Sequence, residues 1–201
     1  MSLLIQNDLE MLRGQNLTAM AGMDEAGRGA LAGPVVVAAV VLDYNVPIPG
    51  LNDSKLLSAK RRNELYEQII NSAGAYHIVA IPPARIDEIN ILHATLTGFQ
   101  YAYKTIKDWA TFALVDGRDL PDGVSGKAII KGDSRHACIA AASILAKVHR
   151  DRLMVELDLQ YPEYGFFAHK GYGTAGHYKA LSTFGPSPLH RKSFRLTPQK
   201  Q

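Results

Sequence analysis

Four acidic residues of the sequence lie beside apolar stretches, at positions where carboxylates can gather in a catalytic site. Asp24 and Glu25 follow a short apolar stretch, Asp116 follows a second one, and Asp133 precedes a long alanine-rich run. Catalytic side chains gather at the ends of strands in α/β sheets. A single acidic residue at a strand end is equally well explained as a solvated turn residue. Four of them together favour a shared site.

Carboxylates that converge need a positive charge between them. Two carboxylates about 4 Å apart repel each other by roughly 4 kcal/mol at an effective dielectric constant near 20. Because no histidine or cysteine accompanies the four residues at ligand spacing, the oxygen ligands favour Mg²⁺ or Mn²⁺ over zinc. Such ions hydrolyse phosphodiesters, one ion activating a water and a second stabilising the leaving oxygen. The predicted chemistry is therefore two-metal-ion phosphoryl transfer.

Asp24 and Glu25 are consecutive, which restricts how they can share a site. Consecutive side chains of a regular strand point to opposite faces of the sheet. The two carboxylates can therefore converge only where the strand breaks into the following loop. Gly27 supplies that break, so we expect both residues to lie beyond the end of the strand.

The segment Gly27-Arg28-Gly29 is a glycine-rich loop that could contact a ligand. A dinucleotide-binding loop must open a helix, whereas Pro34 and the valines that follow it predict a strand. The loop therefore joins two strands. Its backbone could hydrogen-bond a sugar hydroxyl while Arg28 contacts a phosphate. A tight turn without a ligand explains it equally well if the neighbouring carboxylates are ignored.

Further polar segments could bind nucleic acid. Ser54 and Lys55 lie in a loop before a helix and could bind a phosphate, although a helix-capping loop explains them nearly as well. Tyr172, among glycines and basic residues, could stack on a sugar or base, or could belong to an ordinary surface loop. Basic residues on a long helix and near the C-terminus would extend a basic track, or singly form a solvated face: Lys147, Arg150, Arg152, His190, Arg191, Lys192 and Arg195.

Apolar periodicity predicts the elements that must position these side chains. Strands are expected over 18–23, 35–42, 75–81, 111–115 and 128–130, and helices over 58–70, 84–89, 91–108 and 137–159. This mixed order predicts a single α/β domain over 1–201. From residue 161 onward the chain is rich in glycine, proline, aromatic and basic residues, which predicts a loop-rich, partly helical appendage.

Composition narrows the class of protein. Lysine and arginine number 22 against 19 aspartates and glutamates, a net charge of +3 that suits a polyanionic partner without requiring one. Cys138, the single cysteine, lies in an alanine-rich run and is expected to be a small buried residue. The sequence shows neither a secretion signal nor an apolar run of membrane-spanning length. We therefore expect a soluble, cytoplasmic protein that makes no use of a membrane.

Seven blocks of the sequence carry a resemblance to a known family. They are AGMDEAGRG (21–29), LNDSK (51–55), NILHAT (90–95), VDG (115–117), KGDS (131–134), AASILAKV (141–148) and HKGYGT (169–174). Over residues 19–195 the chain resembles the type 2 ribonuclease H family. The acidic glycine-rich block followed by VDG and KGD in this order is highly specific to that family.

The resemblance implies both a fold and a set of site residues. The fold is α/β and ribonuclease H-like, with a central mixed β-sheet flanked by helices and a small C-terminal appendage. Asp24, Glu25, Asp116 and Asp133 correspond to catalytic carboxylates that bind Mn²⁺ or Mg²⁺. The residues that correspond to the readers of a ribose 2′-hydroxyl are Gly27, Arg28, Gly29 and Tyr172.

The resemblance also implies a reaction. Members cut the RNA strand of RNA/DNA hybrids and cut on the 5′ side of ribonucleotides embedded in duplex DNA, leaving a 5′-phosphate and a 3′-hydroxyl. We accordingly expect a monomer that needs no organic cofactor and whose partner is the nucleic acid.

Two other functions are compatible with parts of the sequence. A module that binds hybrid duplexes without cutting them would need the same basic and aromatic surface but not four acidic residues. A nucleotide-dependent enzyme would use the glycine loop, which the strand after it argues against. Metal-dependent cutting of a duplex with one ribonucleotide distinguishes hydrolysis from both.

Overall fold

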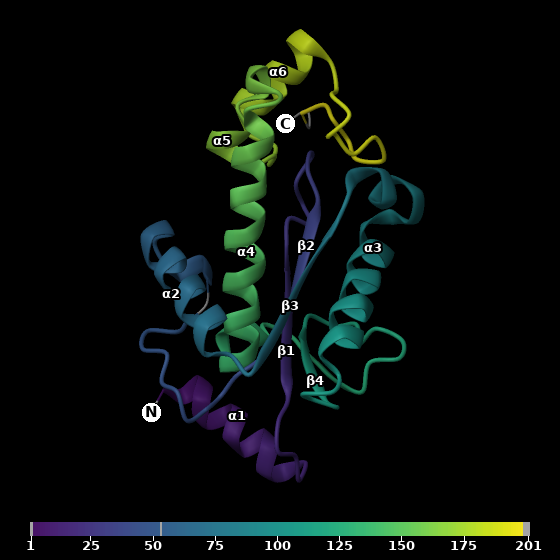
Figure 1. Ribbon diagram of the computed structural model, residues 1–201. Helices are drawn as coiled ribbons and strands as arrows, with labels where there is room; N and C mark the ends of the chain where they lie inside the picture. The colour runs from purple at the N-terminus through teal and green to yellow at the C-terminus, as the bar shows by residue number, and fades with distance from the viewer. Residues whose placement is uncertain (1, 53, 199–201) are drawn as a thin grey trace.

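A five-stranded mixed sheet forms the centre of the molecule in the computed structural model, which describes residues 2–52 and 54–198 (Figure 1). The strand order is β3-β2-β1-β4-β5. β1 is antiparallel to β2 and parallel to β4, β2 is antiparallel to β3, and β4 is parallel to β5. The strands are β1 (Ala21–Ala26), β2 (Val35–Val41), β3 (Ala75–Ile81), β4 (Ala113–Asp116) and β5 (Gly126–Ile129).

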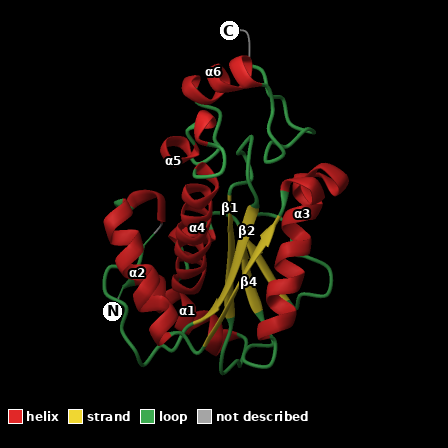
Figure 2. Ribbon diagram, turned by 45° about the horizontal axis from the view of Figure 1, so that its top comes forward, coloured by secondary structure: helices red, strands yellow, loops and turns green. Residues whose placement is uncertain are grey.

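Helices cover both faces of this sheet (Figure 2). α1 (Leu3–Gly14), α2 (Ala59–Ser72) and α4 (Ala137–Asp158) lie on one face, and α3 (Pro83–Ile106) lies on the other. The predicted mixed sheet flanked by helices is therefore confirmed. Shorter elements are η1 (Ser54–Leu56), η2 (Gly132–Ser134), η3 (Pro162–Tyr164), α5 (Phe166–His169) and α6 (Ala175–Phe184).

β2 is buried on both faces because valine and alanine occupy every position of the strand. Val36, Ala38 and Val40 pack on the side of α4, whereas Val37 and Ala39 pack on the side of α3. The strand thus supplies both hydrophobic cores at once, as expected of a central strand that reads as a continuous apolar run.

α4 lies unusually close to β1 because both elements carry small residues at their contact. A Cβ atom added to Gly22 would lie 2.0 Å from the carbonyl carbon of Cys138. Cys138 is buried at this contact, as predicted. The close approach brings the side chain of Asp24, two residues further along β1, against the same helix.

The strands next to the acidic residues differ from the predicted ones. β1 begins and ends three residues later than expected, so Asp24 and Glu25 lie inside the strand and not beyond it. The prediction failed because it ended the strand with its apolar residues. Pairing with β2 holds the polar residues in a regular strand, with Asp24 opposite Ala38 and Glu25 opposite Val37. Similarly, Asp116 is the last residue of β4.

α1 is a helix that the sequence reasoning did not predict. Its buried residues are Leu4, Asp8 and Leu12, which lie on one side of the helix at intervals of four. The Asp8 carboxylate accepts hydrogen bonds from the Tyr44 hydroxyl and the Cys138 amide and pairs with the His136 ring, each at 2.8 Å. A buried acidic residue in the apolar stripe hides the helical pattern, although it fixes α1 to the start of α4.

The break predicted between two helices in 84–108 is confirmed. α3 runs continuously except at Asn90, which has φ 64° and ψ 166°. The Asn90 side chain then accepts a hydrogen bond from the His93 amide and so caps the second half of the helix.

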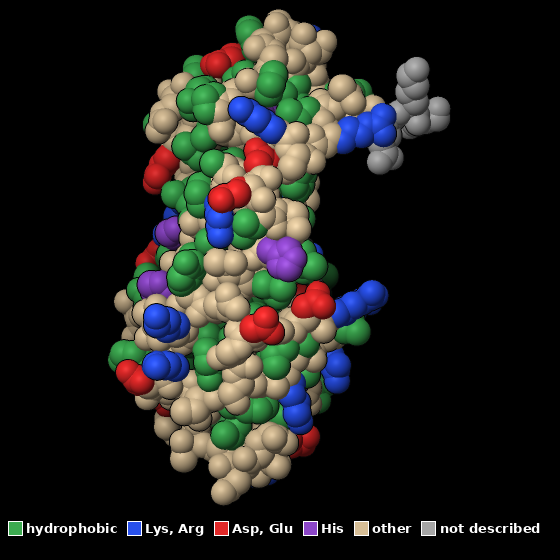
Figure 3. All heavy atoms as spheres, turned by 90° about the vertical axis from the view of Figure 1, so that its right-hand side faces the viewer, with side chains coloured by type: hydrophobic (Ala, Val, Ile, Leu, Met, Phe, Trp, Pro, Cys, Tyr) green, Lys and Arg blue, Asp and Glu red, His purple; other side chains and the backbone are tan. Residues whose placement is uncertain are grey.

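The C-terminal residues form a separate layer at the end of α4. η3, α5 and α6 pack around a small core of Ala32, Met154, Tyr164, Phe166 and Ala180, and Figure 1 shows them beyond the end of the sheet. Basic and acidic side chains are interspersed on the face that α3 covers (Figure 3). Among the described residues, no helix is long and apolar enough to cross a membrane.

Candidate active site

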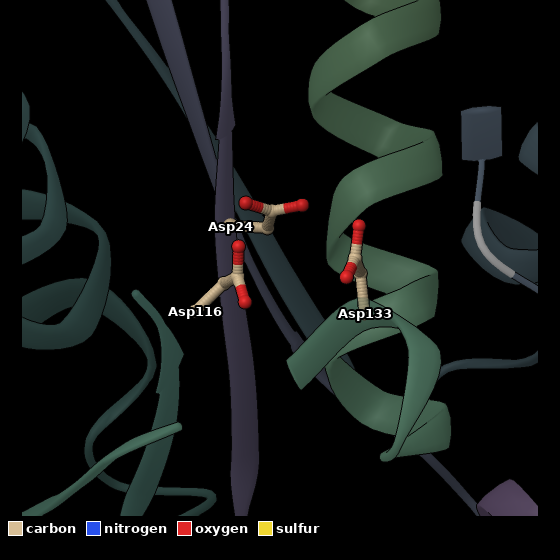
Figure 4. Close-up of side chains that lie close together, drawn as sticks. All are labelled: Asp24, Asp116 and Asp133. Atoms are coloured by element: carbon tan, nitrogen blue, oxygen red, sulfur yellow. The ribbon is translucent and has the colours of Figure 1, made fainter. Parts of the chain in front are cut away.

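Three of the four predicted acidic residues meet at one point of the structure. Asp24, Asp116 and Asp133 each offer a carboxylate oxygen, and these oxygens all lie within 4.8 Å of one another. Their side chains point toward one another from β1, β4 and the turn before α4 (Figure 4). This separation is short enough for one divalent cation to bridge them.

The sheet and a short turn position the three aspartates. Met23 pairs with Val115 at the end of the parallel ladder, so Asp24 and Asp116 follow side by side directly after the last paired residues. Asp116 accepts a hydrogen bond of 2.6 Å from the amide of Gly132, the residue before Asp133. The turn that carries Asp133 is thereby fixed to the end of β4.

Glu25 lies in the same cleft but outside the group of three. It is opposite Val37 and therefore on the α3 side of the sheet, whereas Asp24 is on the α4 side. Its carboxylate contacts the guanidinium of Arg28 at 3.5 Å. Glu25 thus borders the site from the glycine-rich loop.

The electrostatics of the site disfavour negative charge. Burial raises the pKa of Asp24 well above its ordinary value, and the nearby carboxylates of Glu25 and Asp116 raise it further. Burial also raises the pKa of Glu25, which the Arg28 guanidinium opposes and Asp116 reinforces. A divalent cation would reverse both effects, because it stabilises the ionised carboxylates.

Ser143 is a site residue that the sequence reasoning missed. It lies on α4, 4% exposed, and its hydroxyl is 2.9 Å from that of Ser54. The Ser143 side chain also hydrogen-bonds Asp24. The available signal was a polar residue within the apolar run Ala137–Ala146, all of which is buried. Ser54 is thus placed beside the carboxylates, while the side chain of Lys55 lies outside the described residues.

Four of the predicted substrate-binding residues line the same cleft, which has a volume of about 290 Å³: Gly27, Arg28, Ser54 and Tyr172. Gly27 has φ +94°, a left-handed value that favours glycine. Gly29 is exposed beside Arg28 and does not border the cleft. The cleft is lined by Asp24, Glu25, Ala26, Gly27, Arg28, Ser54, Arg62, Asp116, Ser143, Lys147 and Tyr172.

The predicted basic track is wrong for three of its members. Arg150, His190 and Arg191 are buried, and only 0%, 1% and 0% of their surfaces are exposed. The two arginines donate hydrogen bonds to backbone carbonyls, and the His190 ring hydrogen-bonds with His177 and Ser187. The sequence shows their charge but not this packing. Lys147 does line the cleft, with its ammonium 5.8 Å from the centre of the Tyr172 ring.

Comparison with known proteins gives a consistent result. The model of the family described as ribonuclease HII matches residues 21–197. The chain belongs to the ribonuclease HII family. A ribonuclease HII from Shewanella halifaxensis is 56% identical over 176 residues, which cover 87% of this chain and 87% of the relative.

Solved structures agree with this assignment. A chain of the PCNA:RNase HII complex from Archaeoglobus fulgidus matches with a TM-score of 0.76 and 26% identity, covering 90% of this chain and 98% of that one. The ribonuclease H2 of Pyrococcus horikoshii matches with a TM-score of 0.73 and 28% identity, covering 89% and 95%. The ribonuclease H-like fold is therefore confirmed, and the chain is a metal-dependent ribonuclease H that degrades RNA in RNA/DNA hybrids.

Proposed function

We propose that this ribonuclease HII also cuts duplex DNA on the 5′ side of a single embedded ribonucleotide, leaving a 5′-phosphate and a 3′-hydroxyl. The observation that carries the proposal is the joining of two sets of residues in one cleft. Two of the three clustered aspartates, Asp24 and Asp116, line this cleft, and so do Gly27, Arg28 and Tyr172. A scissile phosphate at the carboxylates would therefore place its neighbouring sugar against the glycine-rich loop.

The donor set fits two divalent ions of the Mg²⁺ or Mn²⁺ class. Asp24, Asp116 and Asp133 converge within 4.8 Å, and Glu25 borders the same cleft. All four offer only hard oxygen ligands, which these ions prefer. When bound, the ions would activate the attacking water and stabilise the leaving oxygen. The carboxylates would hold these ions in place, and Ser143 holds Asp24 through a hydrogen bond.

The reading of the 2′-hydroxyl is assigned to backbone and aromatic groups. Gly27 and Gly29 leave the loop backbone open to a sugar hydroxyl, and Arg28, which is exposed, can contact a phosphate. Tyr172 can stack on the sugar or base. Ser54 lies at the cleft wall near the carboxylates, where its hydroxyl would contact the substrate backbone. A phosphate contact by Lys55 stays a prediction from the sequence. Deoxyribose lacks the hydroxyl that these groups read.

One assay tests the proposal against a binding module. A labelled DNA duplex with one ribonucleotide is incubated with the protein and Mg²⁺ or Mn²⁺, and then with EDTA. We expect a single cut 5′ of the ribonucleotide with either ion and none with EDTA. Intact duplex in the presence of both ions would overturn the proposal, and tight binding without cutting would favour the binding module.

The variant Tyr172→Ala tests separately whether the tyrosine ring takes part in recognising the ribonucleotide. We expect slower cutting at an isolated ribonucleotide together with a nearly unchanged melting temperature, because the ring lies at the cleft wall. Unchanged cutting would show that Tyr172 does not take part in recognising the ribonucleotide.

The monomeric state stays a prediction, which light scattering on the purified protein tests.

A further inference from the structure

Two completely buried arginines lie directly behind the glycine-rich loop. Arg150 is on α4 and Arg191 is near the C-terminus, and both are 0% exposed. Within residues 2–52 and 54–198, neither guanidinium forms an ion pair with a carboxylate. Burial lowers the pKa of both arginines, and the proximity of Arg150 lowers that of Arg191 further, to about 9. Buried charge of this kind is strongly destabilising unless hydrogen bonds replace those to water.

Backbone carbonyls supply those hydrogen bonds. Arg150 donates to the carbonyls of Ala32, Pro34 and Lys170 at 3.0 to 3.1 Å. A single guanidinium therefore binds three backbone carbonyls. Because Ala32 and Pro34 belong to the loop after β1 and Lys170 precedes Tyr172, the guanidinium connects two segments far apart in the sequence.

Arg191 completes the connection from the other side. Its guanidinium donates to the carbonyls of Arg28 at 2.8 Å and Gly33 at 3.0 Å. Its amide donates to Leu31 at 2.9 Å. The exposed tip of the loop, Arg28 and Gly29, is thus carried on a buried base whose carbonyls are held by cationic side chains.

Steric contacts link the same arginines to the two reading elements. A Cβ atom added to Gly27 would lie 1.9 Å from Nε of Arg150. The Arg150 guanidinium carbon is also 5.2 Å from the centre of the Tyr172 ring, within the range of a cation–π contact. One side chain therefore sets the distance between Gly27 and Tyr172.

We propose that Arg150 and Arg191 are positioning residues that fix the Gly27–Gly29 tip relative to Tyr172 and so determine discrimination for a ribonucleotide. We call this pair the arginine clamp. The inference rests on the proposed function, because it assumes that the loop and Tyr172 read the sugar. The clamp itself touches neither the reacting phosphate nor the aspartates.

Arginine is suited to this task in a way that lysine is not. Its planar group presents five N–H donors in a fixed arrangement, whereas an ammonium is a compact charge that cannot reach three carbonyls in the same directions. Arg150→Lys and Arg191→Lys therefore preserve the charge while removing the geometry. Arg85→Lys, at an exposed ion pair with Glu88 on α3, is the matched control.

The first measurement is cutting under single-turnover conditions. For Arg150→Lys we expect the rate on a duplex with one ribonucleotide to fall about tenfold or more, because small displacements of positioning groups have effects of this order. Mn²⁺ binding in calorimetry should stay within about twofold of the wild type, because the aspartates are held by separate elements. Arg85→Lys should match the wild type in both. A variant that cuts at the wild-type rate would overturn the inference, as would one that loses Mn²⁺ binding in proportion to its rate.

The second measurement does not depend on cutting. In Arg150→Lys and Arg191→Lys, amide hydrogen exchange should accelerate in peptides covering 28–33 and 170–173 and stay unchanged in β2. Equal protection in all segments would contradict the clamp even if the protein were not a ribonuclease. Conversely, a wild-type protein that fails to cut ribonucleotide-containing DNA would overturn the proposed function, while accelerated exchange in the variants would still support the clamp.

Discussion

Like charges are buried together in two regions of this molecule, and the two regions balance them differently. At the carboxylate cluster, three acidic side chains face one another within 4.8 Å, and the pKa of Asp24 is raised. At the arginine clamp, five loop and segment carbonyls accept hydrogen bonds from the two guanidiniums. The protein's own backbone balances the cations, whereas an added cation would balance the aspartates. The carboxylate cluster is therefore suited to binding a cation, whereas the arginine clamp is suited to fixing the conformation of the loop.

The largest expected effect comes from a substitution in the carboxylate cluster. Asp116→Asn removes one negative ligand while keeping the size of the side chain, so we expect turnover to fall by about 10³-fold or more, a loss of roughly 4 kcal/mol in transition-state stabilisation. Binding of a hybrid duplex should change only a few-fold. Electrophoretic cutting and binding assays measure the two, with the exposed Asp108→Asn as control. Turnover at the wild-type level would refute the assignment of Asp116 as a ligand.

The next largest effect comes from a substitution that disturbs the arginine clamp without changing any charge. Gly27→Ala introduces a Cβ against Arg150 and requires φ +94°, so we expect a loss of about 2 kcal/mol in the free energy of unfolding and a large loss of cutting at ribonucleotides. At Gly29 an added Cβ meets no atom within 4 Å, so Gly29→Ala should unfold like the wild type. Urea titrations compare them. Equal stability of the two variants would show that the contact with Arg150 is not limiting.

The histidines beside the arginine clamp predict how low pH affects the stability of the folded protein. His190 accepts a hydrogen bond from the Ser187 amide at Nδ1, and its Nε2 is 2.9 Å from Nε2 of His177. His177 in turn bonds the Tyr172 carbonyl through Nδ1 at 3.0 Å. This arrangement fits neutral rings, and burial together with the proximity of His177 lowers the pKa of His190 to about 4.

A histidine whose pKa falls on folding stabilises the protein above its unfolded pKa, near 6.5, and loses that stabilisation as the pH falls toward 4. We expect the free energy of unfolding to drop by about 2 kcal/mol over this range on account of His190. Chemical denaturation at several pH values measures the slope. His190→Gln should be less stable at pH 7 but should show a flatter profile; an unchanged slope would assign the acid sensitivity elsewhere.

The smallest expected effect concerns the cost of keeping the aspartates together. A carboxyl whose pKa rises on folding destabilises the folded protein as the pH increases through and above its unfolded pKa. Asp24→Asn should therefore raise the melting temperature of the metal-free protein at pH 7 by a few degrees, and abolish the stabilisation that Mn²⁺ gives the wild type. Thermal scans with EDTA and with Mn²⁺ test both. A lower melting temperature with EDTA would mean that Asp24 is structurally required.

The sequence by itself predicted a shared site for four acidic residues, three of which the structure brings together. It also predicted the strand-loop-strand setting of Gly27–Gly29 and the break at Asn90. These features depend on residue type and local spacing, which act over a few residues of chain. The same reasoning placed Asp24 and Glu25 beyond β1, because an apolar run shows where burial ends but not how far pairing with β2 continues.

Only the tertiary structure decided which charged residues are buried and what they contact. Asp8, Arg150 and Arg191 resemble surface residues in the sequence, yet each is completely buried, because its partners come from segments 20 or more positions away along the chain. Ser143 likewise gains its role from Ser54 and Asp24. Hydrogen bonds between distant segments leave no periodic pattern in a sequence, and so the partners of these side chains appear only once the sheet and α4 have been assembled.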